Sequence, residues 1–178
     1  MINITLQSVV ALALALLFIS AGLHKLRSGL RFQAQLAEYK LMPETVVRPA
    51  AYLLAVVELL IAPALLLSAT RPYAGTFAAM LLVMYGIAIA INLVRGRDYI
   101  DCGCGDTPQM LTPWLLLRNG LLAGAALLTT LPAPTTTFAW NDLLIAVPAF
   151  VVVCLVYQVA EQMLENASVL REWSQLRD

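Results

Sequence analysis

The chain has 178 residues, of which 61% are hydrophobic and 12% are charged, and its formal net charge is zero. Soluble domains have about 45–50% apolar and about 25% charged residues, so this composition excludes an ordinary soluble domain and favours a membrane protein. The charge balance shows no basic stripe for nucleic acid, and three cysteines are too few for a disulfide scaffold.

Long stretches with few or no charges predict an all-α integral membrane protein, a bundle of about five transmembrane helices. Each stretch has roughly 20 residues, enough to cross a hydrocarbon core of about 30 Å. The fifth contains Pro148 and could instead be a buried helix under the bundle, so we expect a four-helix core plus a C-terminal fifth helix. The predicted spans are Ile4–Leu23, Val46–Ser68, Tyr73–Val94, Pro113–Leu131 and Leu143–Ala160.

Two segments outside the spans mix apolar and charged residues at helical spacing. Between the first and second spans, residues 25–49 place Phe32 beside Arg31, a pattern typical of an amphipathic helix at a membrane surface. Residues 161–178 repeat this pattern at the C-terminus. We therefore expect one transmembrane domain, residues 1–160, followed by an amphipathic tail.

The order of the spans places most of the charged segments on one face of the membrane. The segment between spans one and two, the segment between spans three and four, and the tail must share a face in either orientation. The cations of this face are Lys25, Arg27, Arg31, Lys40, Arg48, Arg95, Arg97, Arg171 and Arg177. Only Arg71 is expected on the opposite face, so the positive-inside rule predicts that the first face lies in the cytoplasm and the N-terminus outside.

A short polar segment, Asp101-Cys102-Gly103-Cys104-Gly105-Asp106, lies between the third and fourth spans. Gly103 allows the backbone to turn tightly enough for the two thiols to close a small ring. Such a ring is strained and readily reduced, which suits an exchanging disulfide better than a permanent one. Asp101 opposes formation of the reactive thiolate, whereas nearby arginines favour it.

Three functions fit Cys102 and Cys104 at this point. The first is a thiol–disulfide oxidoreductase, in which the pair cycles between dithiol and disulfide by exchange with a partner protein. The second is a soft-metal subunit that binds or transports copper or zinc, with the same thiols as ligands. The third is a non-catalytic membrane scaffold in which the pair is only structural.

Polar residues inside the predicted spans are further candidates, because they are costly in hydrocarbon unless they have partners. Glu58 lies near the middle of the second span, and we expect it to pair with Lys25 or Arg118. Arg118, near the start of the fourth span, could instead snorkel to the surface or hold a thiolate or a quinone oxygen. Asn119 follows it, and Asn92, near the end of the third span, could hydrogen-bond to another helix.

Together these motifs resemble the MauE family of methylamine-utilisation membrane proteins, within the wider DoxX-like group. The residues that carry the resemblance are Gly22-Leu23-His24-Lys25-Leu26, Glu58, Asn92, Asp101-Cys102-Gly103-Cys104-Gly105 and Arg118-Asn119, within about Ile4 to Leu131. Members of the family usually have the sequence Cys-Gly-Cys-Phe-Gly. This chain lacks the Phe, so Gly105 follows Cys104 directly. The local loop geometry is therefore expected to differ, while the thiol pair is kept.

The resemblance implies a redox-associated inner-membrane protein. Members are linked to maturation of the disulfide-rich small subunit of periplasmic methylamine dehydrogenase, together with a thioredoxin-like partner. We expect Cys102 and Cys104 to be the catalytic pair, and we predict no cofactor, with a quinone left as a possibility. Periplasmic disulfide chemistry places the thiols outside, whereas the cation count places them inside. Either the charge rule fails for this chain or electrons cross the bundle.

Overall fold

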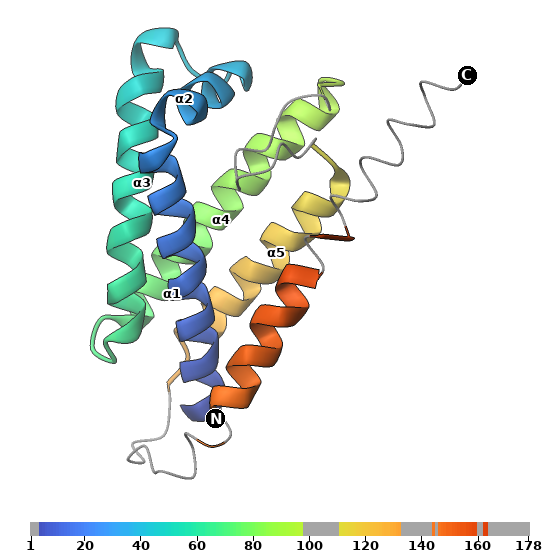
Figure 1. Cartoon of the computed structure of the whole chain (residues 1–178). Helices are drawn as coiled ribbons and strands as arrows, with labels where there is room; N and C mark the ends of the chain where they lie inside the picture. The colour runs from blue at the N-terminus through green and yellow to red at the C-terminus, as the bar shows by residue number, and fades with distance from the viewer. Residues whose placement is uncertain (1–3, 98–110, 133–143, 145, 160–161, 164–178) are drawn as a thin grey trace.

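The computed structural model describes residues 4–97, 111–132, 144, 146–159 and 162–163. All regular structure in this part of the chain is helical, which confirms the predicted fold class (Figure 1). A further apolar helix, Ala146–Val159, follows the labelled ones. The labelled helices are α1 (Ile4–Arg27), α2 (Gly29–Glu38), α3 (Glu44–Leu66), α4 (Arg71–Val94) and α5 (Pro113–Leu128).

Among the described residues, α1, α3 and α4 are long and apolar enough to cross a membrane. The helix α5 has 16 residues and ends before the predicted Leu131. The hydroxyl groups of Thr129 and Thr130 donate to the carbonyl oxygens of Ala126 and Leu127, each at 2.7 Å, and so compete with continued helix there. The described helix Ala146–Val159 lies within the fifth predicted span.

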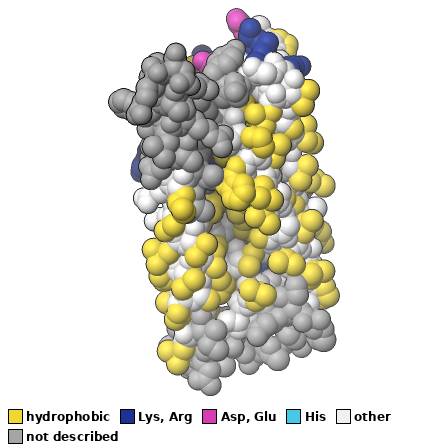
Figure 2. All heavy atoms as spheres, turned by 90° about the vertical axis from the view of Figure 1, so that its right-hand side faces the viewer, with side chains coloured by type: hydrophobic (Ala, Val, Ile, Leu, Met, Phe, Trp, Pro, Cys, Tyr) yellow, Lys and Arg dark blue, Asp and Glu magenta, His cyan; other side chains and the backbone are white. Residues whose placement is uncertain are grey.

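The outer surface of the helices is apolar along most of their length. Figure 2 shows hydrophobic side chains down the side of the bundle and charged side chains near one end. Leu60 of α3, Phe77 of α4 and Leu121 of α5 are each more than 60% exposed, at 65%, 63% and 67%. A surface of this kind matches contact with lipid, so the chain is a multi-pass membrane protein.

Two close helix pairs form the bundle, because α1 packs along α3 and α4 packs along α5. A cluster that includes Phe18, Leu65, Leu82 and Ala123 is buried between the two pairs. A glycine lies at a close contact in each pair, as is usual for membrane helices, whose backbones approach closely where side chains are small. Gly22 of α1 faces Ala55 and Leu59 of α3, and Gly75 of α4 faces Ala126 and Thr129 of α5.

Replacement of Gly75 by alanine is expected to destabilise the protein by about 1–3 kcal/mol, the usual cost of overpacking. The new methyl group would lie 2.8 Å from the Ala126 carbonyl oxygen and would overlap the Thr129 hydroxyl. Gly124→Ala on α5 is the matched control, because no atom lies within 4 Å of the added carbon. Thermal unfolding of both variants in detergent measures the effect. Equal stability of the two variants would show that the α4–α5 contact adapts freely.

The predicted amphipathic segment contains a helix, α2, which lies across the end of the bundle where α1 ends (Figure 1). Its apolar face turns inward, since Phe32 and Tyr39 are buried while Arg31 and Glu38 are exposed. The helix is shorter than the predicted segment because Lys40, with a φ of 47°, leaves the right-handed helical conformation. The end of α4 and the start of α5 lie at this same end, as the span order requires.

The opposite end of the bundle is closed by side chains that bond to free carbonyl groups. The side-chain Nε2 of Gln7 donates to the carbonyl oxygens of Thr129 and Leu131, at 2.9 and 2.8 Å. Arg71 Nε donates to the Leu65 carbonyl oxygen at 3.1 Å, near the end of α3. Cations bond well to the last carbonyls of a helix, so the one cation predicted for this face has a local structural partner.

Candidate functional site

The charged residues buried in the membrane helices meet near the α2 end of the bundle. Lys25 comes from the last turn of α1 and Glu58 from α3, and their exposed fractions are only 6% and 1%. Lys25 Nζ donates to both carboxylate oxygens of Glu58, at 2.7 and 2.8 Å. Tyr85 of α4 donates its hydroxyl to Glu58 Oε1 at 2.7 Å. Three helices are thus joined through one carboxylate.

Two aromatic rings cover the lysine. Lys25 Nζ lies 5.2 Å from the centre of the Phe32 ring of α2 and 5.4 Å from that of Tyr85. A cation this close to an aromatic face is attracted by the ring quadrupole, more strongly where water is excluded. The ion pair therefore also links the surface helix α2 to the bundle.

Close packing of α1 on α3 explains why Lys25 meets Glu58. Gly22 allows α1 to approach Ala55 and Leu59, and Lys25 lies one helical turn beyond Gly22. The sequence left Lys25 and Arg118 as alternative partners of Glu58, and the structure selects Lys25. Arg118 lies half-buried on α5. Tyr85 and Phe32 were missed, although a tyrosine hydroxyl within a membrane span is a signal that a polar partner is near.

The two buried asparagines bond within their own helices. Asn92 Nδ2 donates to the Ala88 carbonyl oxygen at 3.1 Å, and Asn119 Nδ2 donates to that of Leu115 at 2.8 Å. The bond from Asn92 to another helix, expected from the sequence, is not found in the described part of the chain. The carbonyl one turn earlier is the nearest acceptor for a short side chain on a helix. The Oδ1 atom of Asn92 is buried and has no hydrogen-bond partner among the described residues.

The chain leaves α4 and enters α5 at well-defined positions on the α2 end. At the end of α4, Gly96 has a φ of 67°. The N–H of Gly96 donates to the carbonyl oxygen of Leu93, and the N–H of Arg97 donates to the carbonyl oxygen of Asn92. These two bonds form a Schellman motif, which closes a helix end. Thr112 and Pro113 begin α5 as predicted, but the Thr112 side chain makes no capping hydrogen bond.

Asp101, Cys102, Gly103 and Cys104 lie between these two helix ends and outside the described residues, so their roles stay predictions. The predicted tail also lies almost entirely outside them. Over the ranges that are described, no group of three or more His, Cys, Asp or Glu side chains could hold a metal ion.

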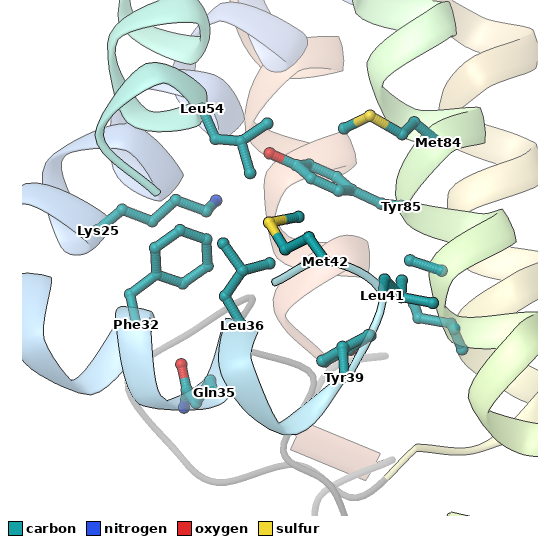
Figure 3. Close-up of a pocket in the computed structure, with 12 residues that line it drawn as sticks. Lys25, Phe32, Gln35, Leu36, Tyr39, Leu41, Met42, Leu54, Met84 and Tyr85 are labelled. Carbon is teal, nitrogen blue, oxygen red and sulfur yellow. The ribbon is translucent and has the colours of Figure 1, made fainter. Parts of the chain in front are cut away.

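A cavity of about 140 Å³ lies beneath α2 and beside the ion pair. Figure 3 shows Lys25, Phe32 and Met42 facing Tyr85 and Leu54 across it. The lining comes from four helices and the α2–α3 connection, and it is mainly apolar, with Lys25 and Gln35 as its nitrogen-bearing side chains. The arrangement can accept a small, largely apolar group with a polar atom at one end.

Residues 4–132 match the family model described as methylamine utilisation protein MauE. The chain belongs to the MauE family. This match covers α1 to α5 and the segment with both cysteines, so the family resemblance drawn from the motifs is confirmed. No solved structure matches the chain.

Three relatives, each named methylamine utilization protein MauE, show the extent of the similarity. The protein from Methylophilus methylotrophus is 36% identical over 163 residues, covering 89% of this chain and 86% of the relative. That from Methylorubrum extorquens is 47% identical over 116 residues, 64% of this chain and 62% of the relative. That from Paracoccus denitrificans is 40% identical over 124 residues, 67% of each chain.

Proposed function

We propose that this MauE-family chain is a thiol–disulfide redox protein of the bacterial inner membrane. Cys102 and Cys104 exchange electrons with a thioredoxin-fold partner and so support disulfide formation in a periplasmic enzyme of methylamine utilisation. The observation that carries the proposal is the family match over residues 4–132, which includes both cysteines. The names of the relatives supply the metabolic context.

The placement of the described chain supports this proposal. Arg97 and Leu111, which flank the cysteine segment, follow α4 and precede α5 at the α2 end of the bundle. Leu111 is buried with Tyr39, Ile89 and Leu115, so the start of α5 is held against α4 and the α2–α3 connection. The helix ends that precede and follow the cysteine segment are therefore fixed in position at this end of the bundle.

The exchange proceeds in two steps that balance. A thiolate of the client protein attacks one sulfur of the Cys102–Cys104 disulfide, forming a mixed disulfide and releasing the other sulfur as a thiolate. A second client thiolate then attacks the mixed disulfide, which leaves the client oxidised and the pair reduced by two electrons. The disulfide of a thioredoxin-fold partner or another two-electron acceptor must then reoxidise the pair.

Two orientations are compatible with this chemistry. With the α2 end in the periplasm, the pair exchanges directly with the partner and the client. With the α2 end in the cytoplasm, as the cation count predicts, the pair exchanges with a partner there and electrons cross the bundle.

Differential alkylation in intact cells tests redox state and orientation together. Cys154→Ser removes the third cysteine, so that membrane-permeant and membrane-impermeant maleimides report on Cys102 and Cys104 alone. The pair is expected to shift between disulfide and dithiol when the thioredoxin-fold partner is deleted, and the impermeant reagent reports the membrane side. A pair that stays in one state under both conditions would contradict the proposal. Stoichiometric copper or zinc that is lost with the cysteines would instead favour a metal-binding subunit.

A further inference from the structure

We propose that the cavity beneath α2 binds the ring of a membrane quinone, which accepts the electrons of the Cys102–Cys104 dithiol. The inference rests on the proposed redox function and names its electron acceptor. The binding site itself consists only of described residues on α1, α2, α3 and α4 and in the α2–α3 connection.

The size and walls of the cavity suit one six-membered ring. Its volume is about 140 Å³. A protein cavity of about 150 Å³ lined by aliphatic and aromatic side chains is known to hold benzene. Phe32, Leu36, Leu54 and Ile89 supply such walls, and Met42 adapts readily to the shape of a ligand.

The charge at the polar end of the cavity favours a neutral ligand. Lys25 lines the cavity, but its charge is balanced by Glu58 at 2.7 Å. A carboxylate or phosphate ligand would have to compete with Glu58 for the ammonium group and would add an unbalanced buried charge. A carbonyl oxygen needs only a hydrogen-bond donor, and the ammonium group, which has three N–H bonds and donates to the two Glu58 oxygens, has one N–H bond left to offer.

The cavity is reached from the apolar outer surface of the bundle. Leu41 and Met84 line it and are 37% and 45% exposed. Lipid covers such a surface in a membrane, so a ligand with an apolar tail can enter with its tail left in the bilayer. A neutral, ring-sized, carbonyl-bearing and lipid-soluble molecule that accepts two electrons is a quinone.

The redox step balances without a further reactant. Two S–H bonds of the dithiol are broken and one S–S bond forms, while two O–H bonds form on the quinone and yield the quinol. Two electrons and two protons pass from sulfur to the ring. Ile89 of the cavity wall packs in one cluster with Leu111, where the described chain resumes after the cysteines.

Binding of decylubiquinone to the purified protein in lipid nanodiscs tests the site. Titration calorimetry is expected to show saturable binding of one molecule per chain. Ala88→Phe fills the cavity and is expected to weaken binding about tenfold or more, whereas Ile87→Phe adds the same ring on the exposed side of α4 and should change it less than about twofold. Absence of saturable binding, or equal binding by the two variants, would overturn the site.

A second measurement does not depend on the folding of Ala88→Phe. An azido-substituted quinone, activated by light on the wild-type protein, should label peptides of α2 and α4, and excess decylubiquinone should prevent the labelling. Labels confined to α5 or to the helix Ala146–Val159 would contradict the proposed position.

The cysteine variants separate this inference from the proposed function. Cys102→Ser/Cys104→Ser is expected to bind decylubiquinone with unchanged affinity. It should form no quinol when the thioredoxin-fold partner, reduced beforehand with dithiothreitol, is added as the electron donor. Failure of the wild type to bind, with thiol cycling still seen by alkylation, would refute the quinone site alone. Binding with no thiol-dependent quinol formation in the wild type would refute the acceptor role.

Discussion

Replacement of Lys25 by methionine is expected to lower the free energy of unfolding by about 3–5 kcal/mol, the usual result of leaving a buried charge without its partner. Glu58 is 1% exposed, and of the hydrogen bonds that it accepts from Lys25 and Tyr85 it would keep only the one from the Tyr85 hydroxyl. Arg27→Met is the matched control, because Arg27 lies in the same last turn of α1 but is exposed. Thermal or denaturant unfolding in detergent measures both variants.

Two further variants separate the charge pair from general damage to the helix contact. Lys25→Met/Glu58→Met removes both charges and is expected to recover most of the lost stability, since a neutral pair needs no desolvation. Tyr85→Phe removes one hydrogen bond to the carboxylate and should cost about 1.5–3 kcal/mol. If Lys25→Met is as stable as Arg27→Met, the ion pair does not hold the helices together.

Replacement of either Cys102 or Cys104 by serine is expected to abolish support of client maturation. A disulfide needs both sulfur atoms, so each single variant should be as inactive as the double variant. The readout is the yield of active, fully disulfide-bonded client enzyme in cells, with the amount of each membrane variant measured in parallel. Cys154→Ser is the control and should retain activity, because Cys154 lies on the separate helix Ala146–Val159.

The single variants carry additional information. With Cys102 or Cys104 alone, the remaining thiol cannot resolve a mixed disulfide from within the pair. A covalent complex with the thioredoxin-fold partner or the client should therefore accumulate and disappear on reduction. If the double serine variant supports as high a yield of matured client as the wild type does, the proposed chemistry is ruled out.

The two predictions concern neighbouring parts of one end of the bundle. The ion pair joins α1, α3 and α4 and is covered by α2, while the cysteine segment connects α4 to α5 at that end. Loss of the ion pair is expected to reduce protein stability and, through it, the amount of active protein. Loss of a thiol is expected to stop the reaction in a protein of normal stability, so stability and activity measurements together separate the two roles.

Features that depend on local composition and on the spacing of hydrophobic residues could be predicted from the sequence alone. Uncharged stretches identified the membrane helices, and the mixed pattern around Phe32 identified the amphipathic helix α2. The number and order of the spans placed α2, the end of α4 and the start of α5 on one face, because successive spans must alternate in direction. The cost of a charge in hydrocarbon indicated that Glu58 has a partner.

The identity of that partner was decided only by the tertiary structure. Lys25 and Arg118 were equally open in the sequence, and the choice depends on how far α1 slides along α3, which the contact of Gly22 with Ala55 and Leu59 determines. The rotation of α4 brought Tyr85 to the same carboxylate and left Asn92 bonded within its own helix. The cavity beneath α2 likewise exists only where four helices and a connection meet. Periodicity shows which residues are buried in a helix, whereas helix translation and rotation decide which of them touch.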